Sequence, residues 1–408
     1  MTRLARRRWP LAATAGLIVI GMVTSTWGAI LVGRPDWALP DDLWRTLIAA
    51  QRLLHGNLSG LYTAPTTLIS FPGAALILVP IVAVAGVAGL SLQMPGPQNG
   101  DPGVWLLAGP YEIAVAALVL FAADAIAEHL GASWPKRAVL AAAGAVALWG
   151  VTLRFGHPED AVAVGLFLYG ILTLARARTW RAGWLTGAAV AVQPLVLLAL
   201  PLVLAVIEWR RWAGFLARAA APGVLALGLA AAANWHATVT AVTRQPNSPT
   251  VNHPTPWISL TTHLGGGMVA AGPARALAIL AACGCAVAVS RRWRAAAPGW
   301  SPEMLAHLLW WIAVALALRS VFEPVMVAYY IWPVLAVALI PATRNWPRLA
   351  TAAAVAAALT FAAQLPWRDP WRWWLLMITG LALVLWLARV PPPTSQRVGA
   401  ALAVEPAP

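Results

Sequence analysis

Three short polar clusters in this chain could carry chemistry. The first is Asp41-Asp42, a pair of adjacent carboxylates at the start of an amphipathic stretch over 40–56. The second is the run RFGHPED at 154–160, and the third lies within 319–330. All three adjoin long apolar runs, where charged groups are costly and are therefore candidates for function.

The adjacent carboxylates allow two interpretations. One is structural: acidic residues at a helix start can cap it and interact favourably with the helix dipole. The other is chemical: a carboxylate can remove a proton from a hydroxyl acceptor as a general base. One residue is enough for the cap, so the second is surplus. Asp42 is the stronger candidate for catalysis and Asp41 is the near alternative.

The second cluster crowds four titratable groups into a short turn between two apolar runs. Pro158, Glu159 and Asp160 suit the first turn of a helix. That structural interpretation leaves Arg154 and His157 unexplained. Arginine and histidine can hold a phosphate by charge-assisted hydrogen bonds, so we expect this turn to bind substrate.

The third cluster contains Arg319 and Glu323, followed by Tyr329. An arginine and a glutamate at this spacing could simply pair across an outer turn. The alternative is an anion-binding arginine, which would stabilise the charge that develops on a leaving phosphate. Gln193, which ends a short apolar run before Pro194, is a further candidate for substrate binding.

Composition indicates the setting of these clusters. Of 408 residues, 60% are hydrophobic and only 10% are charged. Apolar runs of about 20 residues recur along the chain, which predicts an all-α polytopic membrane protein. A soluble enzyme, a disordered chain and a β-barrel are excluded. The net charge of +14 comes from arginines between the apolar runs, so it indicates helix orientation and not nucleic-acid binding.

Hydropathy and charge together favour about twelve transmembrane helices with both termini in the cytoplasm of a plasma (inner) membrane. The predicted spans are 10–32, 104–128, 138–153, 159–175, 182–193, 195–208, 219–236, 274–290, 303–320, 324–342, 349–365 and 372–390. The first outer loop, 33–103, is long. We expect it to contain an interfacial helix at 40–56 and a re-entrant or interfacial apolar segment at 67–90. No phosphate-binding glycine loop occurs, which argues against ATP-driven transport.

Four stretches resemble a known family. They are Asp42-Leu43 with Ala49-Ala50, Leu53-Leu54, Gly56 and Leu61-Tyr62; Phe71-Pro72; the turn at 156–160 with the glycine-rich run 182–194; and Arg319 to Pro324 with Tyr329-Tyr330. They are similar to motifs of the GT-C membrane glycosyltransferases, particularly actinobacterial proteins of glycosyltransferase family 87. Three positions depart from the family pattern: Thr46, Gly73 and Glu323 stand where it has Tyr, Pro and Asp.

This resemblance implies a GT-C-like fold: a seven-helix module over 1–236, variable C-terminal transmembrane helices over 237–390, and a disordered cytoplasmic tail over 391–408. It implies a polyprenyl-phosphate-sugar donor, typically of mannose, and a lipid-linked or glycan acceptor on the outer face. The family's catalytic aspartate maps to Asp42. No cofactor is expected, although the sequence leaves a divalent cation open.

Two other functions stay open at this point. A transporter or flippase of lipid-linked sugars could use the same outer arginines, and would need charged or broken helices near the midplane. Asp124, Glu128 and Glu208 would be its candidate residues if they faced a through-going cavity. A catalytically inert relative that stabilises a partner enzyme is the third interpretation.

Overall fold

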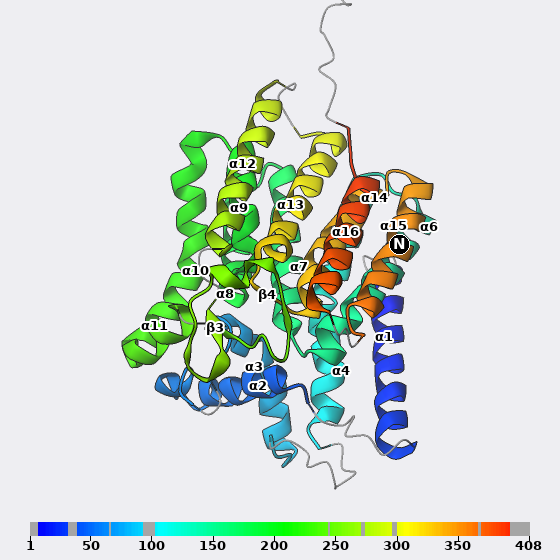
Figure 1. Ribbon diagram of the computed structural model, residues 1–408. Helices are drawn as coiled ribbons and strands as arrows, with labels where there is room; N and C mark the ends of the chain where they lie inside the picture. The colour runs from blue at the N-terminus through cyan, green and yellow to red at the C-terminus, as the bar shows by residue number, and fades with distance from the viewer. Residues whose placement is uncertain are drawn as a thin grey trace, which may run out of the picture.

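The computed structural model describes residues 7–31, 39–64, 67–92, 103–243, 245–270, 274–295, 300–365 and 369–391. Within these ranges the chain is mostly helical, as Figure 1 shows. The predicted cytoplasmic tail beyond residue 391 and parts of the predicted outer loop 33–103 lie outside the described residues.

Among the described residues, eight helical segments are long and apolar enough to cross a membrane, which confirms the prediction of an all-α polytopic membrane protein. Several consist of more than one helix or include a short extra turn. The segments are Arg8–Leu31 (α1, Arg8–Thr26), Trp105–His129 (α4, Trp105–Ala116; α5, Leu118–His129), Trp134–Arg154 (α6, Trp134–Trp149), Pro158–Ala175 (α7), Trp209–Ala233 (α10, Trp212–Ala233), Ala274–Arg294 (α12, Ala274–Ala295), Pro302–Phe322 (α13) and Pro370–Leu387 (α16).

Shorter apolar helices complete the bundle. They are α3 (Pro72–Val87), α8 (Thr179–Val192), the segment Pro194–Val206 that ends in α9 (Leu200–Val206), the segment Ala328–Ala342 that ends in α14 (Trp332–Ala342), and α15 (Trp346–Ala362). Every predicted span coincides with one of these long or short helical segments. How many of the short helices cross the bilayer stays a prediction.

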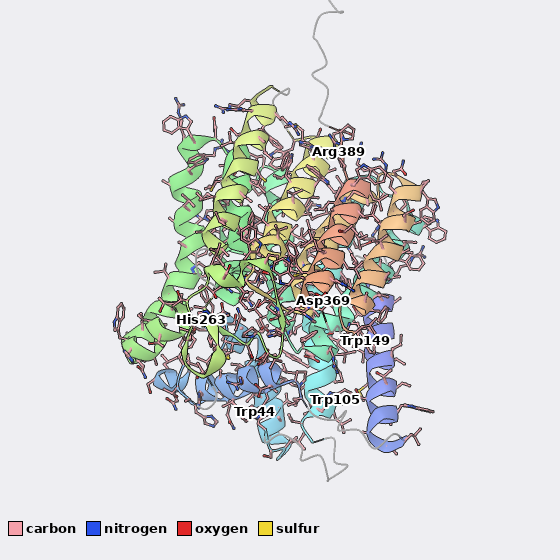
Figure 2. The ribbon with its side chains drawn as sticks, in the orientation of Figure 1. Trp44, Trp105, Trp149, His263, Asp369 and Arg389 are labelled. Carbon is pink, nitrogen blue, oxygen red and sulfur yellow. The ribbon has the colours of Figure 1, made fainter. Side chains whose placement is uncertain are left out.

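The helix order defines two ends of the bundle. α7 starts beside α2 (Asp41–Leu54) and runs away from it, and α8 returns to Gln193. We call the end with α2 and α11 (Trp235–Thr243) the site end, and the opposite end, where α8 and α10 begin, the basic end. Figure 1 shows α2 lying across the bundle at the site end, and Figure 2 shows Trp44 and Trp105 there with Arg389 toward the opposite end.

α2 forms where the amphipathic stretch was predicted. Leu43, Leu47 and Ala50 are buried, whereas Leu54 is 45% exposed and is not part of the packed face. The predicted capping role is wrong, because Pro40 is the N-cap residue and no side chain caps the helix. Asp41 and Asp42 occupy the first turn instead, where acidic side chains interact favourably with the helix dipole.

Four two-residue strands tie the loops of the site end together. β1 (Pro246–Asn247) pairs with β3 (Val269–Ala270), and β2 (His253–Pro254) pairs with β4 (Val325–Met326); both pairs are antiparallel. The second pair anchors the loop after α11 to the segment just after α13. It therefore helps to position Glu323 and the tyrosines that follow it.

Candidate functional site

A tight turn brings the first two polar clusters together. Gly156 has φ +66°, a conformation that other residues rarely adopt, and a Cβ there would lie 2.6 Å from the Cβ of Leu43 on α2. Only glycine permits this close approach of the turn to α2. As a result, the next residue, His157, reaches the first turn of α2.

Asp42, His157 and Glu159 form a hydrogen-bonded chain. His157 Nε2 lies 3.0 Å from Asp42 Oδ2, and His157 Nδ1 lies 2.7 Å from Glu159 Oε1. The side chains of His157 and Glu159 are 3% and 1% exposed, while that of Asp42 is 39% exposed. Asp42 is therefore the solvent-accessible member of a chain that is otherwise buried.

The two partners stabilise each other's charged forms. Burial alone would raise the pKa of Asp42, but the hydrogen bond and charge of His157, helped by Arg45, hold this pKa below its usual value. Burial would lower the pKa of His157, but the charge of Glu159 and the hydrogen bonds to Asp42 and Glu159 raise it well above the usual value. The hydrogen bonds among Asp42, His157 and Glu159 thus favour an ionised Asp42 beside an imidazolium.

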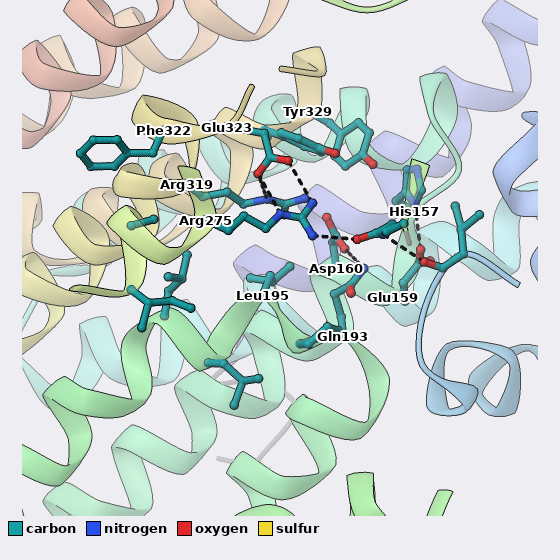
Figure 3. Close-up of a pocket in the computed structure, with 18 residues that line it drawn as sticks. His157, Glu159, Asp160, Gln193, Leu195, Arg275, Arg319, Phe322, Glu323 and Tyr329 are labelled. Atoms are coloured by element: carbon teal, nitrogen blue, oxygen red, sulfur yellow. Dashed lines mark hydrogen bonds and ion pairs between the residues drawn. The ribbon is translucent and has the colours of Figure 1, made fainter. Parts of the chain in front are cut away.

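A cavity of about 330 Å³ opens beside this chain. His157, Glu159 and Asp160 line one side of it, and Gln193 closes the floor by donating to Asp160 Oδ1 at 2.7 Å. Figure 3 shows Asp160 and Gln193 between the His157–Glu159 pair and the arginines on the other side.

The opposite side of the cavity is basic. Arg275 Nη2 donates to Glu323 Oε1 at 2.9 Å, and Arg319 lies 3.9 Å from the other oxygen of the same carboxylate. The Arg319 guanidinium also lies 3.8 Å from the centre of the Tyr330 ring. Two guanidinium groups share one fully buried carboxylate, so this wall keeps a net positive charge that suits an anion.

Tyr329 connects the acidic and basic sides. Its ring lies 4.4 Å from the His157 ring, centre to centre, and it lines the cavity together with Tyr330. Pro194, Leu195, Leu197, Ile279 and Phe322 make the remaining wall apolar. The cavity can therefore hold a ligand with an anionic group, hydroxyl groups and an apolar portion.

Close packing of helix ends shapes the floor of the cavity. A Cβ at Gly73, the first residue after Pro72 in α3, would lie 2.3 Å from the Ala191 carbonyl oxygen in the last turn of α8. The glycine at this position lets α3 contact the backbone just before Gln193. The Ser70 hydroxyl donates to the Val192 carbonyl at 3.2 Å in the same place.

Most of the predicted site residues converge here. Those that line the cavity are His157, Glu159, Asp160, Gln193, Arg319, Glu323 and Tyr329. Asp42 joins them through His157. Two predicted residues do not join them: Asp41 is 56% exposed and pairs with Arg45 at 2.7 Å, and Arg154 is exposed and does not line the cavity.

Sequence reasoning missed Arg275 and Gln245, which hydrogen-bond to each other at 3.0 Å and line the cavity. Arg275 did carry a signal, because it stands at the outer end of a predicted span, where the positive-inside rule disfavours arginine. Sequence reasoning also missed Glu112 on α4. Glu112 is 1% exposed, and its Oε2, like that of Glu159, has no hydrogen-bond partner within the described structure.

No group of three or more His, Cys, Asp or Glu residues that could hold a metal ion occurs in the part of the chain that the structure describes. The expectation that no cofactor is needed is not tested by this finding.

The acidic residues considered for transport lie elsewhere. Arg7 donates to both Asp124 and Glu128 at 2.6 Å, and Arg137 donates to Asp124 at 2.7 Å. This network joins the start of α1 to α5 and α6 at the basic end. Neither Asp124 nor Glu128 lines the cavity.

The fold and the site define a polytopic all-α membrane protein with a charged cavity near one end of its bundle. No known family model matches the chain, and no characterised protein in a curated collection matches it. The function must therefore be argued from the site itself.

Proposed function

We propose that this protein is an integral membrane glycosyltransferase. It transfers mannose or a related sugar from a polyprenyl-phosphate donor to a lipid-linked or cell-envelope acceptor. The reaction takes place on the extracytoplasmic side of a plasma (inner) membrane, and both termini lie in the cytoplasm. The arginines support this orientation, because most of those in the described residues flank the basic end.

One observation carries the proposal: an accessible carboxylate is held ionised beside a cavity whose far wall carries two arginines. Asp42 is the carboxylate, His157 holds it at 3.0 Å, and Arg275 and Arg319 are the cations. Transfer from a glycosyl phosphate needs both a base and cations. The acceptor hydroxyl loses a proton on one side of the reacting carbon, and negative charge develops on the departing phosphate on the other side.

The bond changes assign roles to these residues. The acceptor oxygen forms a bond to the anomeric carbon of the sugar while the bond from that carbon to the phosphate oxygen breaks. Asp42 takes the acceptor proton through the carboxylate oxygen that His157 does not occupy. Arg319 and Arg275 stabilise the charge that moves onto the departing phosphate. Asp160 can accept hydrogen bonds from sugar hydroxyls, and Gln193 can donate hydrogen bonds to them.

The apolar wall fits the lipid portion of the donor. Leu197, Ile279 and Phe322 line the cavity, and Ile279 and Leu197 are also 54% and 43% exposed. Exposed apolar side chains on membrane helices face lipid, so a polyprenyl chain can pass between this wall and the bilayer.

A transporter or flippase gains no comparable support, because Asp124 and Glu128 are engaged in ion pairs away from the cavity. The inert relative was expected to have an outer cavity that lacks both an aspartate and a nearby cation. Asp160 and Arg319 both line this cavity, which favours an enzyme over an inert subunit.

The test is a transfer assay on the purified protein in lipid. The donor is radiolabelled polyprenyl-phosphate-mannose, and the acceptor is a mixed extract of envelope lipids. Label transferred by the wild type and lost in Asp42→Ala, with an unchanged melting temperature, would support the proposal. Transfer retained by a folded Asp42→Ala protein would rule out the assigned base.

A further inference from the structure

A second pocket lies at the basic end and has no part in the proposed reaction. It measures about 260 Å³ and opens between the start of α8 and the start of α10. Its lining consists of Thr179, Trp180, Arg210, Arg211, Gly214, Phe215 and Arg218. α8 separates it from the candidate active site, since that helix begins at this pocket and ends at Gln193.

The pocket is strongly cationic. Arg211 pairs with Glu208 at 3.3 Å, an interaction between two well-exposed side chains. Arg210 lies 5.7 Å from the centre of the Trp209 ring, and Arg218 Nη1 donates to the Gly214 carbonyl at 2.5 Å. This last bond uses one of the five N–H donors of Arg218 and fixes its guanidinium in place. Three arginines and one nearby carboxylate leave a net positive charge that matches a phosphate group.

Glycines leave the space that the pocket occupies. A Cβ at Gly214 would lie 3.1 Å from Arg218 Nη1, and a Cβ at Gly183 would lie 3.1 Å from the Cβ of Arg218. Phe215, which is 1% exposed, packs into the helices beneath the opening. A larger side chain at position 214 would therefore fill the pocket without changing its charge.

The surroundings of the pocket match the depth of lipid headgroups. Trp180 and Trp209 are 58% and 73% exposed, and exposed tryptophans of membrane proteins gather at the membrane–water interface. Further along α10, Val224 and Leu225 are 67% and 64% exposed, as expected for a lipid-facing surface. A ligand in the pocket would thus have a polar site for its head and an apolar helix face for its chains.

We propose that this pocket binds the headgroup phosphate of an anionic phospholipid. Arg210, Arg211 and Arg218 hold the phosphate, and the acyl chains lie along the exposed face of α10. A free phosphate shares the charge but cannot use the apolar face, so the structure favours the lipid. This inference does not depend on the proposed transferase activity.

Native mass spectrometry of the full-length protein in detergent tests this assignment. The probe is phosphatidylglycerol, with phosphatidylcholine, which is zwitterionic and has no net charge, as the comparison. We expect the wild type to retain phosphatidylglycerol preferentially and Arg218→Gln to bind it about fivefold more weakly. Arg291→Gln is the matched control, because Arg291 is an exposed arginine near the same end that does not line the pocket. This control should bind like the wild type.

Gly214→Leu separates shape from charge, since it fills the pocket and removes no arginine, although the Arg218 guanidinium, 3.1 Å from the added Cβ, has to shift. Phosphatidylglycerol retention should fall at least as much as in Arg218→Gln, with an unchanged melting temperature. Equal losses in Arg218→Gln and Arg291→Gln would overturn the proposal, because they would indicate diffuse attraction. Inorganic phosphate that binds as tightly as the lipid, and is lost in the same variants, would also overturn it.

Discussion

The two ends of the bundle use the same residue types in different ways. At the basic end, Asp124 is 1% exposed and is held between Arg7 and Arg137, so these charges neutralise one another and join helices. At the site end, Arg319 and Asp160 face a cavity of about 330 Å³. Charges that complete each other's pairing stabilise a fold, whereas charges directed into a cavity are available to a ligand.

The unpaired atoms follow the same division. The acids of the Asp124 network have partners, while Glu159 and Glu112 each keep a buried oxygen that has no partner among the described residues. A buried polar atom without a partner destabilises the protein, so its retention points to a role in function. Two predictions test this difference between the two ends, and two more test the site end itself.

In the comparison of the two ends, the larger effect is expected from Arg319→Gln at the site end. Removing a guanidinium that stabilises the departing phosphate should lower the transfer rate by about 100- to 1,000-fold. The rate is measured with the radiolabelled donor. Arg154→Gln, which removes an exposed arginine outside the cavity, should leave the rate unchanged. Equal effects of the two substitutions would show that the cavity is not an anion site.

At the basic end, Asp124→Asn should affect stability and not transfer. The substitution weakens charge-assisted hydrogen bonds to Arg7 and Arg137, which should lower the free energy of unfolding by about 2 kcal/mol. Denaturant unfolding in detergent measures this change. Transfer per folded molecule should match the wild type; a large loss of transfer would contradict the division between the two ends.

The pH dependence of transfer should report the pairing of Asp42 with His157. The pKa of Asp42 is lowered, so its pairing contributes stability that is fully present above the unfolded pKa of about 3.9 and is lost as pH falls through the lower folded pKa. The pKa of His157 is raised, so the contribution of its pairing to folding stability is fully present below the unfolded pKa of about 6.5. This contribution is lost as pH rises through the folded pKa.

His157→Gln should therefore shift the acidic limb of the pH–rate profile to higher pH, because Asp42 loses its imidazolium partner. His55→Gln is the control, since His55 is exposed just after α2 and its ring nitrogen hydrogen-bonds to the Gln51 carbonyl, away from Asp42. An acidic limb that does not move in His157→Gln would show that His157 does not set the charge of the base.

The sequence was sufficient to predict the helices and much of the site. Apolar runs determine membrane helices directly, because the bilayer requires long segments with internally paired backbones. The run at 154–160 was identified because its members are neighbours in the chain. The pair Asp42–His157 was not, since its members are separated by 115 positions and meet only through the close approach at Gly156.

The direction in which a side chain points is likewise set by the fold, and it explains why Asp41 and Arg154 do not join the site. Asp41 and Asp42 are equivalent in composition, but adjacent residues on a helix point about 100° apart. One reaches His157 and the other pairs with Arg45 on the exposed side. The two arginines differ in the same way. Arg154 lies within a polar cluster of the sequence but is exposed, whereas Arg275 lies alone in the sequence but lines the cavity.

Asp41 and Asp42 provide the most direct test of the central claim, which is that Asp42 is the base of a sugar-transfer site. The measurement compares the transfer rates of Asp42→Asn and Asp41→Asn in lipid with the labelled donor. The site geometry predicts that Asp42→Asn loses about 100- to 10,000-fold in rate while Asp41→Asn stays close to the wild type. Equal rates in the two folded variants, or a loss confined to Asp41→Asn, would contradict it.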